Sequence, residues 1–138
     1  MVQCVSEEDC VPDEELMAYF TDEKMWGMET FVNLYECDRE LISDENYVRK
    51  YIVELCNFIK MKRYGEPIIE KFGEGDLFGF SFVQLIYTSS LVGHCVEKTG
   101  DMYVDVFSCK EFPPSAVAEF SKNFFKAKDV KYGTLFRE

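Results

Sequence analysis

Five segments of the chain carry the apolar pattern of β-strands. METFVNLY alternates between apolar and polar residues, and the others are short apolar runs bounded by turn residues. The five segments are METFVNLY (28–35), GEPIIEKF (65–72), LFGFSFVQLIY (77–87), DMYVDVFSC (101–109) and VKYGTLF (130–136). The two glycines of GEGD (73–76) predict a tight turn between the second and third strands.

Two other segments have the period of amphipathic helices. After Ser43, which predicts an N-cap, apolar residues recur at helical spacing for about four turns. They are Tyr47, Val48, Tyr51, Ile52, Leu55, Cys56 and Ile59. Pro113 and Pro114 open the second helix, SAVAEFSKNFF (115–125). PDEELMAYF (12–20) predicts a shorter, loosely packed helix with acidic residues in its first turn.

The order strand, helix, three strands, helix, strand predicts an α+β fold. We expect a two-layer sandwich in which both helices cover one face of an antiparallel sheet. The strand 77–87 is apolar on both of its faces, because Phe78, Phe80 and Phe82 alternate with other residues that include Val83 and Leu85. The face without helices therefore predicts contact with a second subunit.

Length and charge narrow the possible functions. The chain has 138 residues, which suits one domain, preceded here by an acidic N-terminal extension over residues 1–24. Its net charge of −11 would repel phosphate backbones, so nucleic acid is not an expected partner. No apolar stretch approaches the ~20 residues of a membrane span. MVQCVSEEDC lacks the form of a signal peptide, and we expect a cytoplasmic protein.

The six cysteines predict free thiols rather than disulfides or a metal site. They are Cys4, Cys10, Cys37, Cys56, Cys95 and Cys109, and no two of them form a CxxC pair. The single histidine, His94, is adjacent to Cys95, and neighbouring residues rarely point at one metal ion. We therefore expect no metal.

The segment YTSSLVGHC (87–95) places hydroxyl, imidazole and thiol groups close together. If the preceding strand continues, Ser81 and Ser89 lie eight residues apart on one face. Residues 90–93 predict a reversing loop, with a positive φ at its glycine, that brings Ser89 opposite His94. A serine beside a histidine is the start of an activated nucleophile, and Cys109 ends the next strand.

Each of these residues also has an ordinary structural interpretation. A serine at a strand end is usually a turn residue, a lone histidine usually lies on the surface or in a hydrogen bond, and a buried cysteine usually acts as a small apolar residue. A hydrolase triad is not favoured, because the chain has no GxSxG motif and no evident acid to orient the histidine.

Taken together, the spacing of the three residues resembles that of the prokaryotic S-adenosylmethionine decarboxylases. Ser89, His94 and Cys109 are separated by four and fourteen residues. The surrounding segments FVNLYECD (31–38), GFSF (79–82) and YVDVFSC (103–109) are similar to the family's motifs. The resemblance assigns residues 25–138 to a domain of this kind. It also implies the α+β sandwich and a homodimer that associates through its sheets.

The resemblance implies a self-processing, pyruvoyl-dependent lyase without a metal. The zymogen would cut itself between Thr88 and Ser89, and Ser89 would become the pyruvoyl group that forms a Schiff base with S-adenosylmethionine. By the same resemblance, His94 and Ser81 assist processing, and Cys109 returns a proton to the substrate. The decarboxylated product would supply the aminopropyl group for spermidine biosynthesis, part of polyamine biosynthesis.

Two departures from the family pattern bear on processing and substrate. Thr88 stands where the family often has glutamate, and Cys95–Lys98 replace its Thr-Trp-Pro-Glu run. Phe72 would then supply the aromatic partner of the adenine, and Glu97 would bind a ribose hydroxyl. A pyruvoyl-dependent arginine or ornithine decarboxylase is a second hypothesis. An unprocessed homologue with a binding or regulatory role is a third.

Overall fold

The computed structural model describes residues 2–3 and 11–138. Its strands are β1 (Val2–Gln3), β2 (Gly27–Tyr35), β3 (Ile68–Phe72), β4 (Gly79–Ile86), β5 (Ser89–Val96), β6 (Asp101–Ser108) and β7 (Asp129–Arg137). Its helices are α1 (Asp13–Asp22), α2 (Arg39–Ile42), α3 (Glu45–Phe58), the 3₁₀ turn η2 (Gly75–Leu77) and α4 (Pro114–Phe125).

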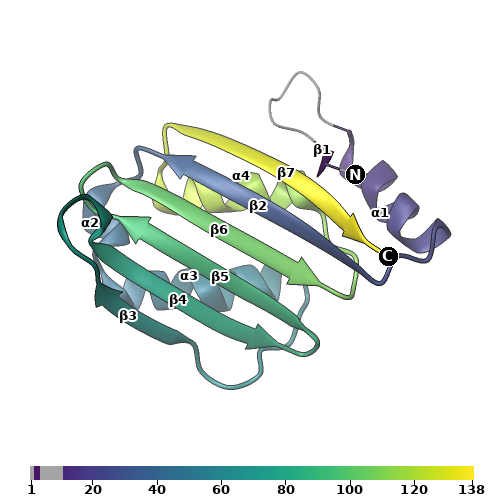
Figure 1. Cartoon of the computed structure of the whole chain (residues 1–138), viewed down its shortest axis with the longest axis horizontal. Coiled ribbons are helices and arrows are strands. Elements are labelled where there is room, and N and C mark those ends of the chain that lie inside the picture. Colours follow the sequence, from purple (N-terminus) through teal and green to yellow (C-terminus); the bar gives the residue numbers. More distant parts are fainter. Residues whose placement is uncertain (1, 4–10) are drawn as a thin grey trace.

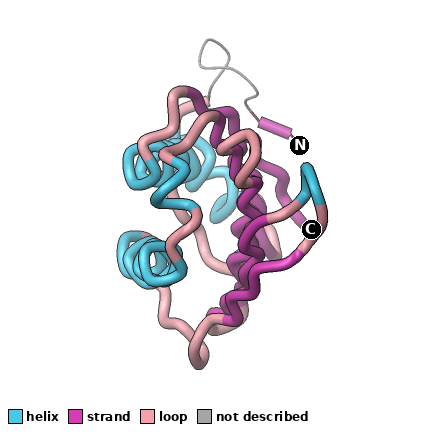
Figure 2. Tube along the Cα trace, turned by 90° about the vertical axis from the view of Figure 1, so that its left-hand side faces the viewer, coloured by secondary structure: helices cyan, strands magenta, loops and turns pink. Residues whose placement is uncertain are grey.

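The strands form one antiparallel sheet in the order β1-β7-β2-β6-β5-β4-β3 (Figure 1). Seen edge-on, α3 and α4 lie together on one side of this sheet (Figure 2). The predicted α+β sandwich with two helices on one face is therefore confirmed. Within the described residues, no helix is both long and apolar enough to cross a membrane.

The two main helices follow the predicted apolar pattern. The inward positions of α3, which include Val48, Tyr51 and Leu55, are completely buried. The predicted N-cap is wrong by one residue. Asp44 caps α3 by accepting hydrogen bonds from the next turn, because its carboxylate reaches two backbone N–H groups, whereas Ser43 bonds back to the carbonyl of α2.

The N-terminal helix α1 packs more firmly than its sequence predicts. Leu16 is buried, and Tyr19 contacts the ring of Phe136 at a centroid distance of 4.8 Å. The carboxylate of Asp13 accepts hydrogen bonds from the Ser115 and Ala116 N–H groups and from the Ser115 hydroxyl. The expectation of loose packing is therefore wrong, because α1 supplies the cap that α4 lacks at its own Pro113. Residues 1 and 4–10 of the predicted extension lie outside the described residues.

The hairpin between β4 and β5 differs from its prediction. The expected loop over residues 90–93 is wrong, since Ser89–Val96 is one continuous strand and the chain reverses at Tyr87 and Thr88. Gly93 serves packing rather than turning, because a Cβ atom there would lie 2.1 Å from the ring of Phe82. The sheet consequently has a strand between residues 77–87 and 101–109 that the sequence pattern missed.

The two faces of the sheet differ sharply. The face covered by α3 and α4, called here the helix face, carries buried residues such as Phe82, Leu91 and Val104. The other face, called the open face, exposes Val83 (38%) and Leu85 (55%). A monomer therefore leaves apolar side chains of β4 in solvent, and the predicted second subunit remains a prediction for this face.

Candidate active site

Ser89 is the first residue of β5, and its side chain turns toward the helix face. It is 9% exposed, and its hydroxyl donates a 3.1 Å hydrogen bond to Oγ of Ser108, the residue directly opposite on β6. The nucleophile predicted from the sequence is thus held between two strands at the end of the sheet.

Thr88 precedes Ser89 and has a left-handed backbone, with φ 58°. This is the second position of a two-residue turn, where glycine or asparagine normally supplies the positive φ. A β-branched residue in that conformation stores ~1–3 kcal/mol of strain. The peptide bond that the sequence predicts to break therefore follows a strained residue.

The Thr88 side chain links this turn to Cys109. Its hydroxyl donates to the carbonyl of Tyr87 at 2.8 Å, and its oxygen is also in hydrogen-bond contact with the Cys109 sulfur. Because the only hydroxyl hydrogen is used at Tyr87, the thiol is the donor to the threonine oxygen. Cys109 thus lies beside the Thr88–Ser89 bond, at the strand end where the sequence placed it.

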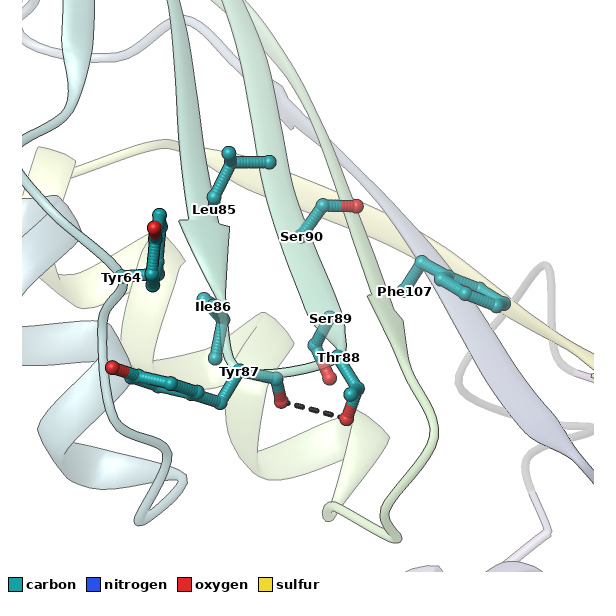
Figure 3. A pocket seen from close by; sticks show the side chains of 8 residues that line it. All are labelled: Tyr64, Leu85, Ile86, Tyr87, Thr88, Ser89, Ser90 and Phe107. Carbon is teal, nitrogen blue, oxygen red and sulfur yellow. Dashed lines mark hydrogen bonds between the residues drawn. The ribbon is translucent and has the colours of Figure 1, made fainter.

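A pocket of about 440 Å³ opens at this turn. It is lined by Tyr64, Leu85, Ile86, Tyr87, Thr88, Ser89, Ser90 and Phe107 (Figure 3). Tyr64 and Tyr87 meet edge to face at 5.4 Å. The lining joins side chains of the helix face, such as Ile86, to side chains of the open face, such as Leu85. The pocket therefore connects the buried serine with the uncovered side of the sheet.

Ser81 and His94 form a second group on the open face. They are directly opposite on β4 and β5, and Ser81 Oγ lies 2.8 Å from His94 Nδ1. Ser89 lies five positions before His94 on the same strand, so the two side chains point to opposite faces of the sheet. Along the strand, the two residues are about 17 Å apart. The expectation that a loop brings Ser89 opposite His94 is wrong, as is the expectation that Ser81 and Ser89 share a face, because the turn comes at Tyr87 and Thr88.

Phe72 and Glu97 lie at the far end of the sheet from Ser89. Phe72 pairs with Gly79, and seven residues of β4, or about 23 Å, separate Gly79 from the partner of Ser89. Glu97 follows the end of β5 and forms a 2.6 Å ion pair with Lys71. Neither side chain lines the pocket at Ser89 of its own chain.

Burial separates the cysteines into two kinds. Burial is also the main cause that raises the pKa of Cys37 to about 12, of Cys56 to about 11 and of Cys95 to about 12. Of the cysteines in the described part of the chain, Cys109 alone is not buried, and all four are free thiols. Cys4 and Cys10 lie outside the described residues. Among the described histidine, cysteine and acidic residues, no group of three could hold a metal ion.

Two residues near Ser89, Tyr64 of the pocket lining and Ser108 behind it, had no signal in the sequence. Tyr64 arrives through a connecting segment, where Arg63 forms an isolated bridge with Ile86. Ser108 faces Ser89 only because the turn is at Tyr87 and Thr88, so this contact depends on a register that the sequence pattern does not predict.

Comparisons with known proteins place this geometry in context. The sequence profile of a family described as S-adenosylmethionine decarboxylase matches residues 28–138. The crystal structure of an adenosylmethionine decarboxylase from Aquifex aeolicus VF5 is similar to this chain with a TM-score of 0.70 and 17% sequence identity, over 82% of this chain and 91% of that one. At that identity the structural match concerns the fold. Helix α1 precedes the residues that the profile matches.

Proposed function

The chain belongs to the S-adenosylmethionine decarboxylase family, and we propose that it decarboxylates S-adenosylmethionine with a pyruvoyl group made from its own Ser89. The observation that carries the proposal is the turn at Thr88–Ser89. There a strained residue, a buried hydroxyl and an accessible thiol meet beside a pocket. This combination suits both self-cleavage and the chemistry that follows it.

The first reaction is self-cleavage of the zymogen. Ser89 Oγ attacks the carbonyl carbon of Thr88, a C–O bond forms, the C–N bond breaks, and the hydroxyl proton passes to the freed nitrogen. Loss of the Thr88 carboxylate from the resulting ester by elimination, and then hydrolysis with release of ammonia, leave the pyruvoyl group at the start of the second fragment. Cutting beside a residue with positive φ also releases its backbone strain.

A homodimer would supply the imidazole for this cleavage. His94 cannot reach Ser89 of its own chain, yet it lies exposed on the open face beside Ser81. The pocket at Ser89 is bounded on that same face by Leu85, Ser90 and Phe107. Two copies that bury their open faces against each other, running in opposite directions, would bring the Ser81–His94 pair of one chain over the Thr88–Ser89 turn of the other.

Decarboxylation would use a different subset of side chains. The pyruvoyl carbonyl, once formed, supplies the electron sink for loss of carbon dioxide. Cys109 lies beside the turn with its S–H available, and it would return the proton to the substrate carbon. The buried Cys95 is poorly suited to that task, because its thiol is shielded from the pocket and has its pKa raised to about 12 by burial.

The pocket suits a flat, partly apolar substrate. Tyr64, Tyr87 and Phe107 line it, and aromatic faces of this kind stack on adenine. Phe72 and Glu97 remain proposed substrate contacts, contributed across the dimer from the other chain. The product would feed spermidine synthesis in the cytoplasm.

Intact mass spectrometry, with and without a reductive amine trap, tests the proposal. We expect fragments of residues 1–88 and 89–138, and an adduct on the second fragment alone. Release of carbon dioxide should be faster from S-adenosylmethionine than from arginine or ornithine. An intact, untrapped chain would instead favour a non-catalytic homologue, and a preference for either amino acid would change the substrate while keeping the mechanism.

A further inference from the structure

Ser108 is a completely buried polar residue at the centre of three contacts. Its Oγ lies 3.1 Å from Ser89 Oγ, 2.9 Å from the backbone nitrogen of Lys110 and 3.6 Å from the sulfur of Met61. Buried hydroxyl groups are normally satisfied, but this one is satisfied mainly by receiving hydrogen bonds. It lies in the segment YVDVFSC (103–109), but neither that resemblance nor the spacing of the candidate residues gives it a role.

The hydrogen atoms around Ser108 can be assigned from its neighbours. The Lys110 N–H can only donate, and it occupies one acceptor site of the Ser108 oxygen. The hydrogen of Ser108 itself points to the thioether of Met61, which is a weak acceptor. The second acceptor site is thus left for the hydroxyl hydrogen of Ser89. The direction of the Ser89–Ser108 hydrogen bond is therefore set by its surroundings.

We propose that Ser108 is a positioning residue for self-cleavage, an inference that rests on the proposed function. By accepting the Ser89 hydrogen, it directs that hydrogen away from the backbone and keeps a lone pair of Ser89 Oγ free to form the C–O bond. Ser108 does not carry the proton onward, because a thioether cannot accept it. The proton that leaves Ser89 passes to the nitrogen of the breaking C–N bond by way of another group.

This role ends when cleavage ends. The hydroxyl of Ser89 is lost when the pyruvoyl group forms, so Ser108 has no hydroxyl left to orient during decarboxylation. Loss of Ser108 should therefore slow cleavage while leaving turnover per cleaved chain nearly unchanged. A purely structural serine would affect both in proportion to the loss of folded protein.

The test compares cleavage rates of freshly purified precursors at neutral pH. Ser108→Ala should cleave about tenfold more slowly than wild type, the effect expected from losing one orienting hydrogen bond. Ser108→Cys keeps the shape of the side chain, but its thiol is a weak hydrogen-bond acceptor, so this variant should also cleave slowly. Ser108→Thr keeps a hydroxyl group and should cleave at the wild-type rate. Ser121→Ala is the matched control, because Ser121 is equally buried and its hydroxyl bonds Tyr51 at 2.7 Å, away from the turn.

Hydroxylamine distinguishes orientation of the attack from later steps. It cleaves the ester intermediate, so it should not rescue Ser108→Ala if the ester forms slowly. Full rescue by hydroxylamine, wild-type cleavage by both Ser108→Ala and Ser108→Cys, or equal slowing by Ser121→Ala would each overturn the role of Ser108. Failure of the proposed function is a separate result, because then wild type itself stays uncut.

Discussion

The cleavage turn, defined by Thr88, Ser89, Ser108 and Cys109, contrasts with the Ser81–His94 pair. The turn is assembled within one chain, where Ser89 and Ser108 are buried and bonded to each other. The pair lies on the open face, where His94 is exposed and touches none of the turn residues. In the proposed function, the first region holds the Ser89 nucleophile in a fixed position, and the second presents an imidazole to a partner chain.

This difference follows from the geometry of a single sheet. Neighbouring positions on a strand point to opposite faces, so a buried nucleophile and an exposed base an odd number of positions apart cannot meet on their own strand. Only a second copy, laid against the open face, would close the gap. In the proposed function, this division would make cleavage dependent on assembly, and the experiments below test each side of it.

Loss of the Ser89 hydroxyl should have the largest effect. Ser89→Ala removes the only atom that can form the ester, and the protein should remain one chain without decarboxylase activity. Ser90→Ala is the matched control, since the adjacent serine faces the other side of β5 and should leave cleavage intact. A gel of each purified protein after long incubation provides the measurement, and cleavage of Ser89→Ala would contradict the assignment.

An imidazole from another chain should be able to replace the missing side chain of His94. His94→Ala should slow cleavage by ~10²–10⁴-fold, the usual value of general acid–base help. When His94→Ala is coexpressed with Ser89→Ala, mixed dimers should cleave the His94→Ala chain, because its partner provides the missing imidazole. Mass spectrometry identifies which chain is cut. If neither chain is cut in verified mixed dimers, the histidine does not act across the interface.

Loss of the Cys109 thiol should reduce the turnover of the processed protein more than it reduces processing. Cys109→Ala should still process at least in part, but turnover of the processed protein should fall by ~10²–10⁴-fold, because proton return loses its donor. Cys95→Ala, a buried thiol on the helix face, should keep most of the turnover. Carbon dioxide release per cleaved chain measures both. Unchanged turnover in Cys109→Ala would move the proton donor elsewhere.

The backbone strain at Thr88 should give the smallest effect. In the uncleavable Ser89→Ala background, Thr88→Gly should raise the free energy of unfolding by ~1 kcal/mol, because glycine accepts φ 58° without a Cβ clash. Urea denaturation measures this change. With Ser89 present, Thr88→Gly should cleave more slowly, since less strain is released. A destabilised variant would show that the threonine side chain contributes more than its backbone costs.

The hydrophobic periodicity of the sequence predicted the helices and most strands of this fold better than it predicted the turns between them. The period of α3 and the alternation of β2 follow from burial on one side, which the sequence displays directly. The reversal at Tyr87–Thr88 carries no glycine or asparagine, and Gly93 offered a false signal because it packs against Phe82. The candidate site residues were proposed from their spacing and the family resemblance, but their division between two faces depended on that single misplaced turn.

The strand order would have a consequence for the protein after the proposed cleavage. If the chain is divided at Thr88–Ser89, β2 of the first fragment would lie between β6 and β7 of the second, and β4 would still pair with β5. The precursor folds as one polypeptide, whereas the mature protein could refold only by an encounter between two. Its recovery from heat or denaturant should therefore depend on protein concentration. Denaturation after cleavage would then be harder to reverse than denaturation of the precursor.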